Sequence, residues 1–346
     1  MKAQTEENGP NTPSDLAARD AMPARPVQLQ MYERMLLIRR MEERLGDDFK
    51  AGKLPGPVHL YIGQEATAVG VCIQLSDIDW ITSTHRGHGH FLAKGGEPKQ
   101  MMAEVYGRST GICKGMGGSM HVADMSRGIM GANGIVGGGI GLAVGAALAA
   151  QLDGRGAVVA TFFGDGAANQ GVLMEAFNLA SLWSLPLVFV CENNGFSEFS
   201  PSATVTSGAI VDRGKPFLIS CADVDGNNVL AVWQTASQAI ERARGGGGPS
   251  LIEAITYRLR GHVEAESQFL AESYRSADDI ARWRARDPIE TFATSLKSNG
   301  IADDAALSLI NERVTKLVEE ATAFAESSPF PEPDSIYGCM FSNQNP

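Results

Sequence analysis

The first regular pattern of apolar and polar positions along the chain is helical. Between residues 28 and 51, apolar side chains recur every three or four positions and charged side chains fill the opposite face. The apolar positions are Leu29, Tyr32, Met35, Leu36, Ile38, Met41, Leu45 and Phe49. The spacing predicts a helix over 28–51, and a second helix is expected over 64–75 after a glycine- and proline-containing loop.

Farther along the chain, short apolar runs alternate with helical patterns. The runs "GAVVATFF" (156–163) and "LPLVFVCE" (185–192) predict buried strands, and residues 169–183 between them predict a helix. Strand, helix, strand in this order indicates a right-handed crossover and a parallel sheet. Further elements expected are helices over 140–151 and 229–245, a strand over 249–259, and mostly helical structure over 277–326.

These patterns predict an α/β fold in which a mostly parallel sheet carries helices on both faces. One domain is expected over 28–330, between a disordered, polar and proline-rich tail (1–27) and a C-terminal tail (331–346). Two segments do not fit regular elements. Residues 79–95 suggest a short strand and a histidine-rich turn, and the glycine-rich residues 107–139 suggest a long functional loop.

Composition narrows the classes of function. A net charge of -11 over 346 residues argues against a nucleic-acid-binding protein, which would normally carry a basic face. No apolar run reaches the roughly 18–20 residues of a membrane helix. The five cysteines form no CxxC pair, which makes a zinc knuckle unlikely and favours reduced thiols. The N-terminal segment resembles neither a signal nor a transit peptide, so we expect a cytoplasmic protein.

The candidate chemistry lies at the ends of the two best-predicted strands. Asp165, within "FFGDGAANQG" (162–171), follows the first strand, and Asn193 and Asn194 follow the second. Ligands bind at the carboxyl ends of strands in parallel sheets, and carboxylate and amide oxygens suit Mg²⁺ or Ca²⁺. The flanking glycines and the following helix would admit a phosphate. The GDG triplet alone is equally compatible with a turn and a helix cap.

The spacing of GDG (164–166) and Asn193–Asn194, with 26 residues between them, is more specific and resembles the thiamine-diphosphate fingerprint. The neighbouring motifs narrow the resemblance: "HLYIGQEA" (59–66), "THRGHGH" (84–90), "KGMGGSMH" (114–121), "GANGIVGGG" (131–139) and "CENNGF" (191–196). Over residues 30–326 the chain resembles the α subunit of 2-oxo-acid dehydrogenase E1 components. Within that family "THRGHGH", "NGIVGGG", "ENNG" and "RGHVEAESQ" (260–268) look most like the acetoin branch, because pyruvate-type relatives more often carry tyrosine at position 85.

The resemblance implies a role for each matching residue. Mg²⁺ would be bound by the side chains of Asp165 and Asn194 and by the carbonyl of residue 196, where Phe196 replaces the usual tyrosine. The cofactor, thiamine diphosphate, would be bound by His85, Arg86, Gly134, Ile135, Val136, Gly164, Asp165, Gly166, Ala167, Asn194, Phe196 and His262. Proton handling is assigned to His262, with His85 beside it. Two departures are Val263, where a phosphorylated serine stands in mammalian pyruvate-type relatives, and a longer loop over 263–275.

The resemblance also implies partners and a reaction. A separate β subunit would bind the pyrimidine half of the cofactor in an α2β2 tetramer, and the lipoyl domain of an E2 acyltransferase would accept the acetyl unit. The expected reaction is cleavage of acetoin. The alternative is oxidative decarboxylation of pyruvate or of a branched-chain 2-oxo acid.

Other functions of the same motifs stay open from the sequence. The glycines of "GGGIGLAVG" (137–145) are also compatible with a dinucleotide-dependent reductase, although close helix packing explains them better. His85, His88 and His90 are compatible with a metal cluster, which the lack of a nearby carboxylate disfavours. A non-catalytic assembly subunit is disfavoured by the intact Asp165, Asn194, Arg86 and His262.

Overall fold

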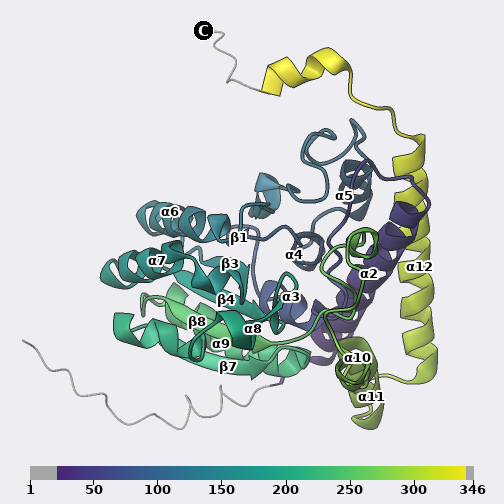
Figure 1. The fold of residues 1–346 in the computed structure, drawn as a ribbon. Coiled ribbons are helices and arrows are strands. Elements are labelled where there is room, and N and C mark those ends of the chain that lie inside the picture. Colours follow the sequence, from purple (N-terminus) through teal and green to yellow (C-terminus); the bar gives the residue numbers. More distant parts are fainter. Residues whose placement is uncertain (1–21, 340–346) are drawn as a thin grey trace, which may run out of the picture.

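The structure, a computed structural model, describes residues 22–339 and is built around a six-stranded parallel sheet (Figure 1). The strand order is β2–β1–β3–β4–β8–β7, and all five pairings are parallel. The strands are β1 (Trp80–Thr82), β2 (Ile129–Gly131), β3 (Val159–Gly164), β4 (Leu187–Asn193), β7 (Ser220–Asp225) and β8 (Ser250–Ile255). The predicted α/β class with a mostly parallel sheet is therefore confirmed.

Helices cover both faces of this sheet, because successive strand residues point to opposite sides. Ala160 and Phe162 belong to one hydrophobic core, whereas Val159 and Phe163 belong to the other. The second core packs under α6 (Gly138–Asp153) and α7 (Gly171–Leu182). The first packs under α3 (Glu65–Cys72) and α9 (Val229–Arg244).

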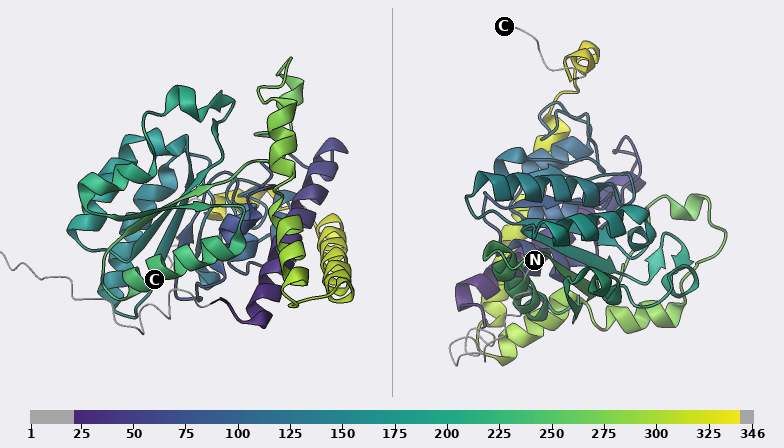
Figure 2. Two further views of the ribbon diagram at one scale, coloured as in Figure 1. Left: turned by 90° about the horizontal axis from the view of Figure 1, so that it is seen from below. Right: turned by 90° about the vertical axis from the view of Figure 1, so that its left-hand side faces the viewer.

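Two long helices complete the first core from outside. Helix α2 (Arg25–Lys50) lies beside α12 (Asp304–Ser327), on the side of the molecule away from α6 and α7 (Figures 1 and 2). Each helix presents an apolar stripe to the core, and Met35 and Val314 are fully buried. Proline at the first turn of α2 and the side chain of Asp303, which accepts a hydrogen bond from the N–H of Ala306, fix the beginnings of these helices.

The remaining elements are shorter than these two helices. They are α4 (His88–Ala93), α5 (Pro98–Val105), η1 (Met125–Arg127), η2 (Ala167–Asn169), β5 (Phe196–Ser197), β6 (Ser200–Pro201), α8 (Ser202–Val205), η3 (Val211–Phe217), η4 (Glu266–Gln268), α10 (Ala277–Arg284), α11 (Pro288–Ser298) and η5 (Pro333–Cys339). Strands β5 and β6 form a separate antiparallel hairpin.

Several predicted boundaries differ from the structure. The first helix begins at Arg25 instead of residue 28, so residues 25–27 of the predicted tail are helical, and residues 1–21 of that tail lie outside the described part. The last strand ends at Ile255, and the C-terminal region contains η5. Of the predicted histidine-rich turn, residues 88–93 form helix α4, whose six residues are all buried.

Two glycines of residues 137–145, Gly137 and Gly139, have a structural role at the beginning of α6. Gly137 has a φ of 81°, which starts α6 in a left-handed conformation. A Cβ on Gly139 would lie 3.1 Å from the carbonyl oxygen of Ser83, so the helix approaches the end of β1 more closely than a larger residue allows. Within residues 22–339, no helix is long and apolar enough to span a membrane.

Candidate active site

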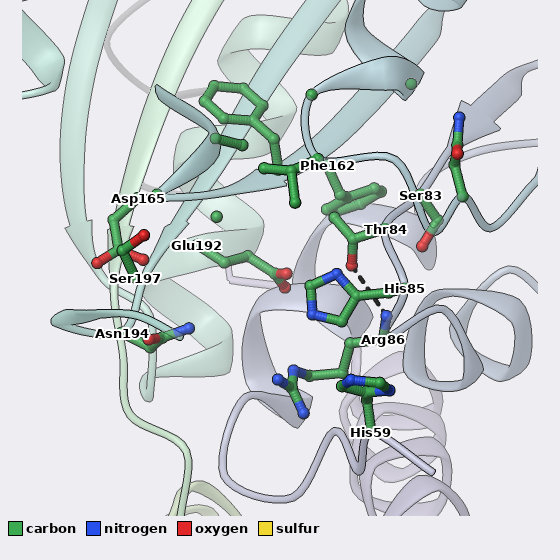
Figure 3. A pocket seen from close by; sticks show the side chains of 18 of the residues that line it. His59, Ser83, Thr84, His85, Arg86, Phe162, Asp165, Glu192, Asn194 and Ser197 are labelled. Atoms are coloured by element: carbon green, nitrogen blue, oxygen red, sulfur yellow. Dashed lines mark hydrogen bonds between the residues drawn. The ribbon is translucent and has the colours of Figure 1, made fainter. Parts of the chain in front are cut away.

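A cavity of about 300 Å³ lies at the carboxyl edge of the sheet, above the ends of β3 and β4 (Figure 3). Gly164 pairs with Glu192 in the ladder between these strands, so the residues that follow each strand emerge side by side. The cavity wall includes every residue that the sequence suggested for the cofactor: His85, Arg86, Gly134, Ile135, Val136, Gly164, Asp165, Gly166, Ala167, Asn194, Phe196 and His262. Segments far apart in the sequence thus converge on one site.

Side chains whose oxygen atoms could coordinate a cation lie on one side of the cavity. The side chain of Asp165 is only 1% exposed, and the hydroxyl of Ser202 donates a hydrogen bond to its Oδ2. Burial raises the pKa of the Asp165 carboxyl, an effect that the Ser202 hydrogen bond opposes. Asn194 is held by Gln64, whose Oε1 accepts from Nδ2 at 3.0 Å, while its own Oδ1 accepts the N–H of Phe196 at 3.2 Å.

Two buried arginines lie on the other side. Arg86 donates to the carbonyl oxygens of Leu60 and His262 at 2.8 and 3.1 Å, and burial lowers its pKa to about 9. Arg258 donates to Nδ1 of His262 at 2.6 Å and to the carbonyl of Glu198 at 2.8 Å, but its Nε has no hydrogen-bond partner. Two cationic groups directed into one cavity favour an anionic ligand.

Three histidine rings line the cavity beside these arginines. The rings of His59 and His85 lie 4.8 Å apart, and each lies 5.1–5.3 Å from the ring of His262. Burial, followed by the charge of Arg86, lowers the pKa of His59 to about 3 and those of His85 and His262 to about 2. Because Arg258 donates to Nδ1, a neutral His262 carries its proton on Nε2 and offers that N–H to the cavity.

The histidines that the sequence suggested as a metal cluster separate in the structure. His88 contacts Glu42 at 3.2 Å, and His90 contacts Glu192 at 3.1 Å, both away from His85. The three histidine side chains that do converge are His59, His85 and His262, whose ligand atoms lie within 4.8 Å of one another. The adjacent arginine charges disfavour a cation there.

The loop that carries His262 is fixed from within. The N–H of His262 donates to the carboxylate of Glu266 at 2.6 Å and to the hydroxyl oxygen of Tyr274 at 3.1 Å. A Cβ on Gly261 would collide with the Glu266 side chain, so a larger residue would displace the carboxylate that accepts the N–H of His262. The long segment 263–275 therefore folds back onto His262, the residue that precedes it.

The sequence assigned no site role to several cavity residues, among them Arg258 and Glu192. For His59, which also lines the cavity, the sequence left a loop residue or an active-site wall open. Glu192 accepts from the hydroxyl of Tyr61 and contacts His90 beneath the cavity. The available signals were an arginine near the end of the predicted strand 249–259 and a carboxylate directly before Asn193–Asn194.

Comparison with known proteins identifies the family. Residues 33–334 match the family described as Dehydrogenase E1 component. The chain belongs to the dehydrogenase E1 component family. The resemblance that the sequence motifs suggested is confirmed, as is the class of enzyme, a thiamine-diphosphate-dependent oxidoreductase.

Individual relatives of this E1 chain cover most of its length. It is 49% identical over 310 residues to the α subunit of acetoin:2,6-dichlorophenolindophenol oxidoreductase of Bacillus subtilis, a match covering 89% of this chain and 91% of the relative. The corresponding subunit of Cupriavidus necator is 46% identical, with 89% and 92% covered. The pyruvate dehydrogenase E1 component subunit α of Rhizobium meliloti is 40% identical, with 89% and 88% covered.

The E1 cavity fits the cofactor that membership implies. Arginine N–H groups, among them the unpartnered Arg258 Nε, suit the anionic end of thiamine diphosphate. A Cβ on Gly166 would lie 2.4 Å from Oγ of Ser197, and both Gly166 and Ala167 line the cavity. The volume lies at the lower end of the range for small-molecule sites.

Proposed function

We propose that this chain is the α subunit of an acetoin-cleaving E1 component. The observation that carries the proposal is the arrangement of opposite chemistries across one cavity, with Asp165 and Asn194 on one side and Arg86, Arg258 and His262 on the other. The identity of 49% and 46% to acetoin:2,6-dichlorophenolindophenol oxidoreductase α subunits, against 40% to a pyruvate-type subunit, supports acetoin as substrate.

In this proposal Mg²⁺ binds on the side of the cavity that carries Asp165 and Asn194. The side chains of Asp165 and Asn194 and the carbonyl oxygen of Phe196 would bind Mg²⁺, a hard cation that prefers oxygen ligands and shares them with phosphate. Replacement of tyrosine by phenylalanine at 196 leaves a carbonyl ligand unchanged. The backbone N–H groups of Gly166 and Ala167, with Gly164 preceding them, would face the diphosphate.

The opposite side of the cavity would bind the rest of the cofactor and would carry the residue that transfers protons. Arg86, with His85 beside it, would pair with diphosphate oxygens, because a planar guanidinium matches them in a forked geometry. The backbone of Gly134, Ile135 and Val136 would contact the aminopyrimidine ring. His262 would donate or accept a proton at Nε2, and a bound anion would raise its pKa from the low value that the arginines impose.

When bound, thiamine diphosphate supplies the carbon nucleophile and electron sink that cleavage of a carbon–carbon bond next to a carbonyl requires. With acetoin the reaction would release acetaldehyde, and the lipoyl disulfide of an E2 acyltransferase would oxidise the remaining two-carbon unit and receive it as an acetyl group. A β subunit in an α2β2 assembly would complete the pyrimidine side of the site.

The test is turnover by the assembled enzyme. This chain would be produced together with the β subunit encoded beside it, supplied with Mg²⁺ and thiamine diphosphate, and assayed by reduction of 2,6-dichlorophenolindophenol. Turnover of acetoin well above pyruvate and branched-chain 2-oxo acids is expected. A preference for one of the acids would contradict acetoin as the substrate. No turnover despite tight cofactor binding would contradict acetoin, pyruvate and branched-chain 2-oxo acids alike.

A further inference from the structure

The glycine-rich loop 111–121 ("GICKGMGGSMH") is wrapped around one buried carboxylate. Glu104, in the last turn of α5, has a fully buried side chain that accepts four backbone N–H groups. Its Oε2 accepts from Cys113 and Gly115, both at 2.8 Å. Its Oε1 accepts from Gly117 at 2.7 Å and from Gly118 at 3.0 Å. Charge-assisted hydrogen bonds of this kind are among the stronger ones in proteins.

The glycines of the motif are those that this arrangement needs. A Cβ on Gly111 would lie 2.3 Å from the Glu104 carboxylate, and Lys114, Gly115 and Gly118 all have left-handed φ angles of 60–77°. Left-handed residues turn successive N–H groups toward one point, which is how backbone concavities bind anions. Here the anion is a side chain of the same protein.

A second buried carboxylate holds the end of the loop. Oε2 of Glu42, on α2, contacts Nδ1 of His88 at 3.2 Å, and Nε2 of His88 contacts the hydroxyl of Ser119 at 3.1 Å. Both Glu42 and His88 are fully buried. The loop is therefore held from two directions, by α5 through Glu104 and by α2 through His88.

The held loop forms one wall of the cavity. Met120 lines the cavity directly. A Cβ on Gly134 would lie 3.8 Å from Sδ of Met120 and 3.7 Å from the ring of His121, so both side chains pack beside Gly134. The next residue, Val122, accepts the N–H of Ala132 at 2.9 Å. The position of the loop thus determines the position of the backbone at Gly134.

We propose that Glu104 is a positioning residue for the pyrimidine end of the cofactor site. The inference rests on the proposed function, which assigns Gly134, Ile135 and Val136 to the aminopyrimidine. Glu104 acts through the loop, because its four hydrogen bonds fix residues 113–118. These residues in turn fix Met120 and His121, whose side chains support Gly134. The diphosphate end, at Asp165, Asn194 and Arg86, has no contact with this loop among the described interactions.

The test compares two ligands on the α–β complex. In Glu104→Gln the amide N–H₂ would face two backbone N–H donors, so two of the four hydrogen bonds are lost while the volume is kept. Affinity for thiamine diphosphate with Mg²⁺ is expected to fall roughly tenfold. Affinity for inorganic diphosphate with Mg²⁺ is expected to change less than about twofold. Amide exchange over residues 111–121 should accelerate. The control is Glu312→Gln, an exposed position on α12.

A variant that keeps the carboxylate guards against misfolding of Glu104→Gln. Gly118→Ala strains a residue with a φ of 60° in open space, so it loosens the loop while Glu104 keeps its carboxylate. It should show the same ligand selectivity with a smaller loss. Unchanged thiamine-diphosphate affinity and unchanged exchange in both variants would overturn the inference. Equal weakening of both ligands would also overturn it, since that indicates general destabilisation. Failure of the unaltered complex to bind thiamine diphosphate would refute the proposed function itself.

Discussion

At the scale of single residues, Asp165 combines near-complete burial with a hydrogen bond from the Ser202 hydroxyl. Such a carboxylate is costly to keep charged unless a cation accompanies it, which is why we assign it to Mg²⁺. Asp165→Asn keeps the shape and removes the charge. Affinity for Mg²⁺–thiamine diphosphate, measured by titration calorimetry, should fall by more than the roughly 10–100-fold typical of losing an outer partner of a metal ligand. Ser202→Ala removes such an outer partner and should show the smaller, roughly 10–100-fold loss of affinity. Normal binding by Asp165→Asn would contradict the metal assignment.

The histidines around the cavity make stability depend on pH. Their pKa values, about 3 for His59 and about 2 for His85 and His262, lie below the ordinary value near 6.5. Below about pH 6.5 the unfolded chain binds protons that the folded chain does not, so stability is complete above that pH and is lost as pH falls toward the folded values. His85→Gln should therefore reduce the drop in Tm between pH 7 and pH 5. A drop in His85→Gln as large as that of the unaltered chain would contradict the assignment.

At the scale of elements, sequence patterns predicted what is local and continuous. The strand over 185–192 and the helix over 229–245 match β4 and α9 closely, because each carries an unbroken pattern and α9 is capped by Asn228. Strand β7 was missed since "SCADVD" lies at the sheet edge, where most of its residues stay partly exposed. Helix α4 was mistaken for a turn because tertiary burial overrides the low helix propensity of Gly89.

The same reasoning separates the predictable part of the site from the rest. Asp165 and Asn194 follow consecutive predicted strands, so the crossover alone brings them together. Arg258 and His59 come from loops that meet only through long-range packing, and no local pattern marks that meeting. Burial of Glu42 on α2 was equally invisible, because a charged residue in a helical pattern normally indicates the solvent face.

Helix α2 offers a direct test of that buried charge. The Oε1 of Glu42 accepts the N–H of Tyr61 at 3.1 Å, and its Oε2 contacts His88. Glu42→Ala leaves both partners buried without an acceptor, so the free energy of unfolding should fall by about 3 kcal/mol or more. Glu43→Ala, next to it, removes only a half-exposed pair with Arg40 and should change stability by less than about 1 kcal/mol. Urea unfolding measures both, and equal losses would contradict a structural role specific to Glu42.

At the scale of the whole molecule, the cavity is open on the side assigned to the pyrimidine ring. Ile135 and Val136 are 73% and 51% exposed, although the proposal gives their backbone a cofactor contact. A wall over these apolar side chains must then come from another chain, and the β subunit is the occupant that we propose. This chain alone should therefore give no turnover of acetoin with Mg²⁺ and thiamine diphosphate, and addition of the β subunit should restore it. Amide exchange over 134–136 should slow on assembly, whereas exchange in the central strand β4 should not change. Full turnover by the isolated chain would show that the site is complete without a partner, and would overturn the two-chain site.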